Sequence, residues 1–74
     1  MSRTRKDSKQ GTVIEIIRLG EDAFDLFVNH EVFRSDARED ALESFLCVRY
    51  GFCGDEYDAI LEEIKTNGRV LINL

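Results

Sequence analysis

The chain contains no proline and only 5 glycines among its 74 residues. Linkers and low-complexity segments are normally rich in glycine, proline or serine, so this composition excludes a chain built of such segments. No apolar run approaches the roughly 18 residues that indicate a transmembrane helix. The basic start is not followed by an apolar stretch and a small-residue cleavage site, as a secretory signal would be. We therefore expect a cytoplasmic protein without membrane association.

Length and composition are those of one small domain. We expect residues 1–10 to form a disordered basic leader and residues 11–74 to form a single small α+β domain. A domain of this size buries only about 60% of the surface of its unfolded chain, which leaves little room for a deep pocket. The apolar fraction of 43% and the charged fraction of 34% exclude a chain too polar to fold.

Charge is divided unevenly along the chain. Residues 1–10 hold 4 basic residues and 1 acidic residue, a net charge of +3, whereas residues 11–74 hold 6 basic and 14 acidic residues, a net charge of −8. A strongly acidic body repels nucleic acids and attracts basic surfaces. We therefore expect a protein partner with a basic surface. Direct nucleic-acid binding through the leader is the alternative that this charge balance opposes.

Three short segments with the composition of strands come first. Residues 12–19 are rich in β-branched side chains, residues 23–28 alternate in polarity, and residues 32–34 are a shorter apolar segment. The turns between them are only two to four residues long, so neighbouring strands should be antiparallel. Residues 12–19 are apolar on both faces, which suits a central strand or an edge strand that meets a partner.

Two amphipathic helices are predicted to follow. Ser35 or Asp36 offers an N-cap for the first helix, Asp36 and Glu39 have the spacing of a capping box, and Gly51 is the expected end. The second helix is predicted to begin with Asp55 as its N-cap and to end at 67–68. Apolar residues recur along it at helical spacing, namely Tyr57, Ile60, Leu61 and Ile64.

The last segment, residues 70–74, alternates in polarity and is predicted to be a strand beside the first one, because a bare Val/Ile edge there would invite aggregation. The predicted fold class is thus α+β: an antiparallel sheet with chain order β-β-β-α-α-β and two amphipathic helices packed on one face. The other face would expose Phe27, either together with Ile14 and Ile16 or together with the residues of opposite parity in segment 12–19. Such a patch would be a binding or dimer surface, unless a loop or the leader covers it.

The two cysteines, Cys47 and Cys53, are six residues apart. In a cytoplasmic protein we expect two free thiols packed as small hydrophobic side chains. A disulfide or redox-sensitive pair is one alternative. A metal set completed by His30 and Asp55 is another, although structural zinc sites usually separate their cysteines by two to four residues.

The carboxylates are only partly explained by helix stability. Acidic residues near helix N-termini complement the helix dipole, but Glu62 and Glu63 lie late in the second helix, where the dipole favours cations. This excess of carboxylates indicates an electropositive partner.

Three aromatic residues fit the predicted apolar stripes and are therefore expected to lie in the core, namely Phe24, Phe45 and Tyr57.

No catalytic constellation is present in the sequence. General acid–base catalysis needs two groups in different environments, whereas these acids lie on predicted surfaces and the only histidine, His30, lies in a predicted turn. A glycine-rich phosphate loop is also absent from the sequence. We therefore expect a protein that is not an enzyme and uses no cofactor or metal ion.

The sequence predicts a small acidic protein-binding module, acting as an inhibitor or regulator of a basic, nucleic-acid-handling protein. Its expected partner-binding residues are four acids for electrostatic steering and two aromatic anchors: Glu56, Asp58, Glu62, Glu63, Tyr50 and Phe52. In size and charge the chain is similar to small phage-encoded inhibitors such as nucleic-acid mimics and anti-CRISPR proteins, a similarity that no residue motif carries. The alternative is a homo-oligomeric structural or accessory protein that associates, for instance as a homodimer, through an uncovered sheet face or an edge strand.

Overall fold

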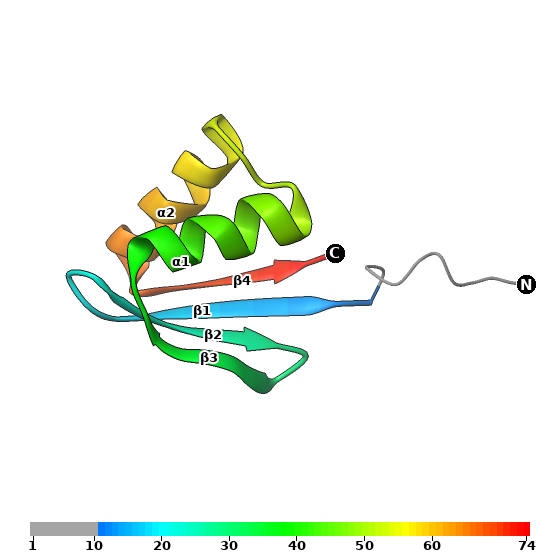
Figure 1. Ribbon diagram of the computed structural model, residues 1–74, viewed down its shortest axis with the longest axis horizontal. Coiled ribbons are helices and arrows are strands. Elements are labelled where there is room, and N and C mark those ends of the chain that lie inside the picture. The colour runs from blue at the N-terminus through cyan, green and yellow to red at the C-terminus, as the bar shows by residue number, and fades with distance from the viewer. Residues whose placement is uncertain (1–10) are drawn as a thin grey trace, which may run out of the picture.

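A computed structural model describes residues 11–74 (Figure 1). The prediction of a disordered leader over residues 1–10 concerns residues outside this range. The elements, in chain order, are β1 (Val13–Gly20), β2 (Ala23–Val28), β3 (Glu31–Ala37), α1 (Glu39–Ser44), the π-helical segment η2 (Phe45–Arg49), α2 (Asp55–Asn67) and β4 (Arg69–Asn73). The predicted α+β class and its order of strands and helices are confirmed. None of the helices between residues 11 and 74 has the length and apolar character needed to cross a membrane.

The four strands form one antiparallel sheet in the order β3-β2-β1-β4. The predicted place of the last strand is confirmed, since β4 pairs with β1 and sets Ile14 opposite Ile72 and Ile16 opposite Val70. The strand that is apolar on both faces, β1, is therefore an interior strand. The β2–β3 turn places Asn29 and His30 at φ values of 52° and 70°, the left-handed conformation that a tight two-residue hairpin loop requires.

The core lies between the sheet and the two helices, which cover the same face of it (Figure 1). Alternate residues of β1 and β2 point toward the helices and are fully buried: Ile14, Ile16, Phe24 and Leu26. The helices contribute Leu42, Phe45, Leu46, Tyr57 and Ile64 to the same cluster. The three predicted core aromatics are thus buried. Because Ile14 and Ile16 face the helices, the alternate set of β1 and β2 side chains, which includes Phe27, lies on the uncovered face.

The start of the first helix differs from the prediction. Asp36 is not an N-cap: it lies near the end of β3 with a φ of 55°, and the helix begins three residues later at Glu39 after Arg38, whose side chain makes no capping bond. The cap comes from elsewhere in the chain, because the backbone N–H of Glu39 donates to Oδ1 of Asp22 at 2.7 Å. Asp22 lies in the β1–β2 turn, so a hairpin and a helix are joined by one carboxylate.

A second carboxylate fixes the end of β3. Oδ1 of Asp25 accepts hydrogen bonds from the hydroxyl of Ser35 and from the backbone N–H of Asp36, both at 3.1 Å. These bonds hold the irregular backbone around Asp36, whose positive φ is tolerated by aspartate better than by most residues. Ser35 and Asp36, expected to cap a helix, are instead held by the neighbouring strand.

The second helix follows the predicted periodicity. Tyr57 and Ile64 are buried, and Ile60 and Leu61 are half-buried against the core. The helix ends as predicted, because Gly68 takes a φ of 85° and its N–H donates to the carbonyl of Ile64. Its N-cap, however, is Gly54 at a φ of 60° rather than Asp55, which is the first helical residue.

The prediction of two free thiols is wrong. The first helix continues into η2, and the predicted end at Gly51 is confirmed by a turn with a φ of 83° at that residue. This reversal brings the Cα atoms of Cys47 and Cys53 to 4.6 Å, and a disulfide joins the two side chains, within the Cα separation that such bonds allow. The alternative of a metal site formed by the two cysteines with His30 and Asp55 is therefore wrong as well. Both sulfurs are bonded to each other, so neither is left as a thiolate ligand, and His30 lies in the β2–β3 turn.

The cap from Asp22 gives a first prediction. Asp22→Ala should lower the free energy of unfolding by about 1 kcal/mol, the usual cost of losing an N-terminal cap. Two controls isolate the cap: Glu21→Ala removes the same charge from a neighbouring exposed acid, and Arg38→Gln removes the ion pair of Arg38 with Asp22 but keeps the cap. Urea unfolding of these variants measures the difference, and equal stability of Asp22→Ala and both controls would contradict the capping role.

Candidate protein-binding surfaces

The outward sides of the two helices form one acidic surface. Both α1 and α2 cover the same face of the sheet (Figure 1), and each carries exposed carboxylates. We define the acidic helical surface as the carboxylates of these helices: Glu39, Asp40, Glu43, Asp55, Glu56, Asp58, Glu62 and Glu63. All are exposed except Glu39, which is half-buried. The four predicted steering residues therefore all lie on an accessible surface.

These carboxylates are not neutralised by neighbouring cations. Among residues 11–74, the side-chain ion pairs join Arg38 to Asp22 at 3.5 Å and Arg69 to Glu15 at 2.8 Å, and neither involves the acidic helical surface. Lys65 is the one cation of α2, and it pairs with no carboxylate of the described chain. The acidic helical surface thus keeps its negative potential.

Two stripes of carboxylates run along α2. Asp58 and Glu62 are four residues apart and therefore neighbours on the helix surface. Glu56 and Glu63 are seven residues apart, about two turns, and lie on another stripe. The structure thus brings the four predicted steering residues together as two pairs on either side of the outward face of the helix.

Tyr57 is a buried residue of α2 whose hydroxyl is affected by carboxylates of both helices. Its side chain is buried, with 6% of the residue exposed, and its hydroxyl has no hydrogen-bond partner among residues 11–74. Burial, and then the negative charges of Glu39, Glu43 and Asp58, raise the pKa of Tyr57 to about 12. Carboxylates from both helices therefore contribute to the raised pKa of one buried hydroxyl, after burial itself.

Tyr50 and Phe52 do not stand out from the loop as the sequence suggested. Both are half-buried and pack against the core, and the ring of Tyr50 meets that of Phe45 edge to face at a centroid distance of 5.3 Å. Their role as partner anchors stays a prediction, and only part of each ring is accessible for it.

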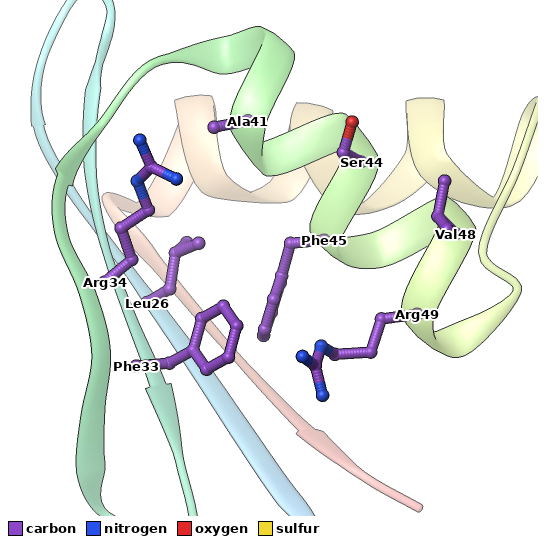
Figure 2. A pocket seen from close by; sticks show the side chains of 8 residues that line it. All are labelled: Leu26, Phe33, Arg34, Ala41, Ser44, Phe45, Val48 and Arg49. Atoms are coloured by element: carbon purple, nitrogen blue, oxygen red, sulfur yellow. The ribbon is translucent and has the colours of Figure 1, made fainter.

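A groove between β3 and the first helix was not predicted. It has a volume of about 440 Å³ and is lined by Leu26, Phe33, Arg34, Ala41, Ser44, Phe45, Val48 and Arg49. We call it the arginine groove. Figure 2 shows the rings of Phe33 and Phe45 side by side in its middle, with Arg34 and Arg49 on opposite sides of them. The ring centroids are 4.9 Å apart, and the guanidinium carbon of Arg49 lies 4.7 Å from the centroid of Phe33.

The uncovered face of the sheet carries a row of side chains across all four strands. Val32 is opposite Phe27, Phe27 is opposite Glu15, and Glu15 is opposite Leu71. Val32 and Leu71 are exposed, and Phe27 is half-buried. The patch expected on this face is therefore the one built from the alternate set of residues, and the carboxylate of Glu15, paired with Arg69, interrupts it.

Comparisons of the chain with protein-family models, with curated proteins and with solved structures found no match. Any argument about function therefore depends on the surfaces described above.

The environment of Tyr57 gives a second prediction. In a Tyr50→Phe background Tyr57 is the one tyrosine left in the chain, so absorbance at 295 nm follows its ionisation alone, and the pKa should lie near 12. Since the folded-state pKa is raised above the ordinary value of 10.0, the free energy of unfolding should fall as the pH rises from about 10 to about 12. Glu39→Gln and Glu43→Gln should each lower this pKa. Ionisation near pH 10 in the folded protein would contradict the coupling.

Proposed function

We propose that this protein is a small, non-enzymatic binding module that uses its acidic helical surface to hold a basic surface of another protein. One observation carries the proposal: two helices that cover the same face of the sheet hold eight carboxylates, seven of them exposed, and none pairs with a cation of the described chain. Complementary charge mainly accelerates encounter and excludes wrong partners. Such a module suits an inhibitor or regulator of a partner with a basic surface.

Nucleic-acid-handling proteins are the partner class that this surface fits best. Their binding sites are basic grooves that derive much of their affinity from the release of counterions. Rows of carboxylates on rigid helices present negative charge to such a groove by the same physics. An inhibitor of this kind would compete with nucleic acid, as the size and charge of the chain suggested.

The proposed location is the cytoplasm. Disulfides are rare there because cellular thiols keep cysteines reduced, so the Cys47–Cys53 bond does not favour this location. The bond closes only the segment 47–53 at the end of the first helix, and the acidic helical surface lies outside that segment. The binding proposal therefore applies to the reduced and the oxidised protein alike.

A double substitution tests the proposed surface. Glu62→Gln/Glu63→Gln removes two charges without shortening either side chain, and both residues are exposed, so stability should change by less than about 0.5 kcal/mol. We expect the basic partner captured from a lysate by the wild-type protein to be lost or strongly reduced with this variant. Quantitative pull-down with thermal unfolding of each variant provides the measurement.

The matched control removes two exposed acids outside the helices, Glu21 in the β1–β2 turn and Glu31 at the start of β3. Glu21→Gln/Glu31→Gln changes the net charge equally but leaves the acidic helical surface intact, so it should retain the partner. Equal capture by both double variants would show that net charge alone, or another surface, is responsible. That result would remove the proposal.

The uncovered sheet face favours a second candidate function, self-association as a structural or accessory protein. Exposed Val32 lies beside the half-buried Phe27 on this face, exposed Leu71 lies beyond Glu15, and β3 and β4 are edge strands. This candidate predicts a dimer at low micromolar concentration by light scattering, which Leu71→Lys should convert to a monomer. A wild-type monomer at that concentration would leave the acidic module as the one supported function.

A further inference from the structure

We propose that the arginine groove is a second binding site, which takes an extended segment of a partner protein carrying a large apolar side chain flanked by carboxylates. The site shares no lining residue with the acidic helical surface and has the opposite charge preference. Three features support it, namely the floor of the groove, the backbone of β3 and the placement of the arginines.

The floor of the groove is apolar and accessible. Phe45 is buried, but Phe33 is 45% exposed and Val48 is 83% exposed, so both present apolar surface to solvent. A small domain gains nothing for its own core by leaving an aromatic ring and a valine uncovered. An apolar side chain placed over the two rings would bury this surface, at roughly 25 cal/mol for each Å² removed from water.

An irregularity in β3 directs two consecutive residues into the groove. Leu26 is opposite Arg34 and Phe27 is opposite Val32, so β3 has one more residue than β2 at this place, which is Phe33. In a regular strand Phe33 and Arg34 would point to opposite faces of the sheet, whereas here both line the groove (Figure 2). Bulges of this kind redirect side chains and are frequent beside functional sites.

The charge of the groove contrasts with that of the rest of the domain. Residues 11–74 hold 14 acids and 6 basic residues, yet the groove is lined by two arginines and no carboxylate. Neither Arg34 nor Arg49 forms an ion pair with another described residue, unlike Arg38 and Arg69. Arginines that lie beside apolar surface without an ion-pair partner are suited to bidentate bonds with carboxylates.

The shape of the groove fits a short extended segment. Its helical wall runs from Ala41 to Arg49, a length of about 12 Å at the rise of an α-helix, which corresponds to three or four residues of extended chain. The opposite wall is β3, an edge strand. Because the bulge interrupts the regularity of that edge, we expect side-chain contacts rather than a continuous strand pairing to hold the segment.

A selection from random heptapeptides displayed on phage, with the full-length protein immobilised, tests this site whatever the sequence of the partner. The selected peptides should carry an aromatic or large aliphatic residue next to aspartate or glutamate. Fluorescence anisotropy of the best labelled peptide then gives its affinity for each variant. Arg34→Gln and Arg49→Gln should each weaken binding at least about tenfold, the loss expected for a charge-assisted hydrogen bond.

Two substitutions at Val48 distinguish a loss of binding from a loss of the folded structure. Because this side chain is largely exposed, both Val48→Glu and Val48→Lys should fold, which thermal unfolding verifies. Val48→Glu should abolish binding of the acidic peptide and Val48→Lys should preserve or strengthen it. Lys65→Gln, which removes one positive charge from α2, is the control for net charge and should leave the affinity unchanged.

The outcomes separate this site from the acidic helical surface. Enrichment of basic peptides alone would support the proposed function and overturn the arginine groove as a peptide site. Acidic peptides whose affinity does not respond to Arg34→Gln, Arg49→Gln and Val48→Glu would bind elsewhere, for example to the basic residues of segment 1–10, and would also overturn it. Self-association that is lost in Arg34→Gln would identify the occupant as a second copy of the chain and would overturn a separate partner.

Discussion

The structure depends on the packing of two short helices against one face of the sheet. Each helix has a single apolar stripe. Both stripes pack in one core cluster with fully buried residues of the inner strands β1 and β2, chiefly Ile14, Ile16, Phe24 and Leu26. A chain of this length cannot build a second layer on the other face. The pairing of β4 with β1 follows from the same constraint, because it gives β1 a neighbour on each side and continues the sheet under α2.

This one-sided packing separates the charges of the protein. Helix stability explains the carboxylates of the two helices only in part, and all eight lack a cationic partner in the described chain. Arg34 and Arg49 lie instead at the margin, where the first helix meets the bulged edge strand. In a domain with a strongly acidic net charge, the carboxylates of the helices and the two arginines of the groove thus line different surfaces. Burial first, and then carboxylates of both helices, raise the pKa of Tyr57.

Features that depend on local periodicity could be predicted from the sequence. The stripe of Tyr57 and Ile64, the helix end at Gly68 and the strand alternation that buries Phe24 all follow from residues close together in the chain.

Features that join distant segments could not be predicted from the sequence. The cap that Asp22 supplies to Glu39 spans 17 residues, and the bulge at Phe33 is defined by its register with β2. The arginine groove combines helical and strand residues, so no spacing in the sequence indicated it. The disulfide stood only as an alternative because a cytoplasmic protein was expected to keep its thiols reduced, although Gly51, whose turn brings the cysteines together, was expected to end the helix.

We expect the acidic helical surface to be the face of the protein that attracts cations. A ¹H–¹⁵N NMR titration of the full-length protein with a nonapeptide of arginines tests it most directly. The account predicts that the largest amide shift changes lie in α1 and α2, and that they diminish as the sodium chloride concentration rises, since salt screens exposed charges. Shift changes centred on the uncovered face of β1 and β4, or changes insensitive to salt, would contradict the account.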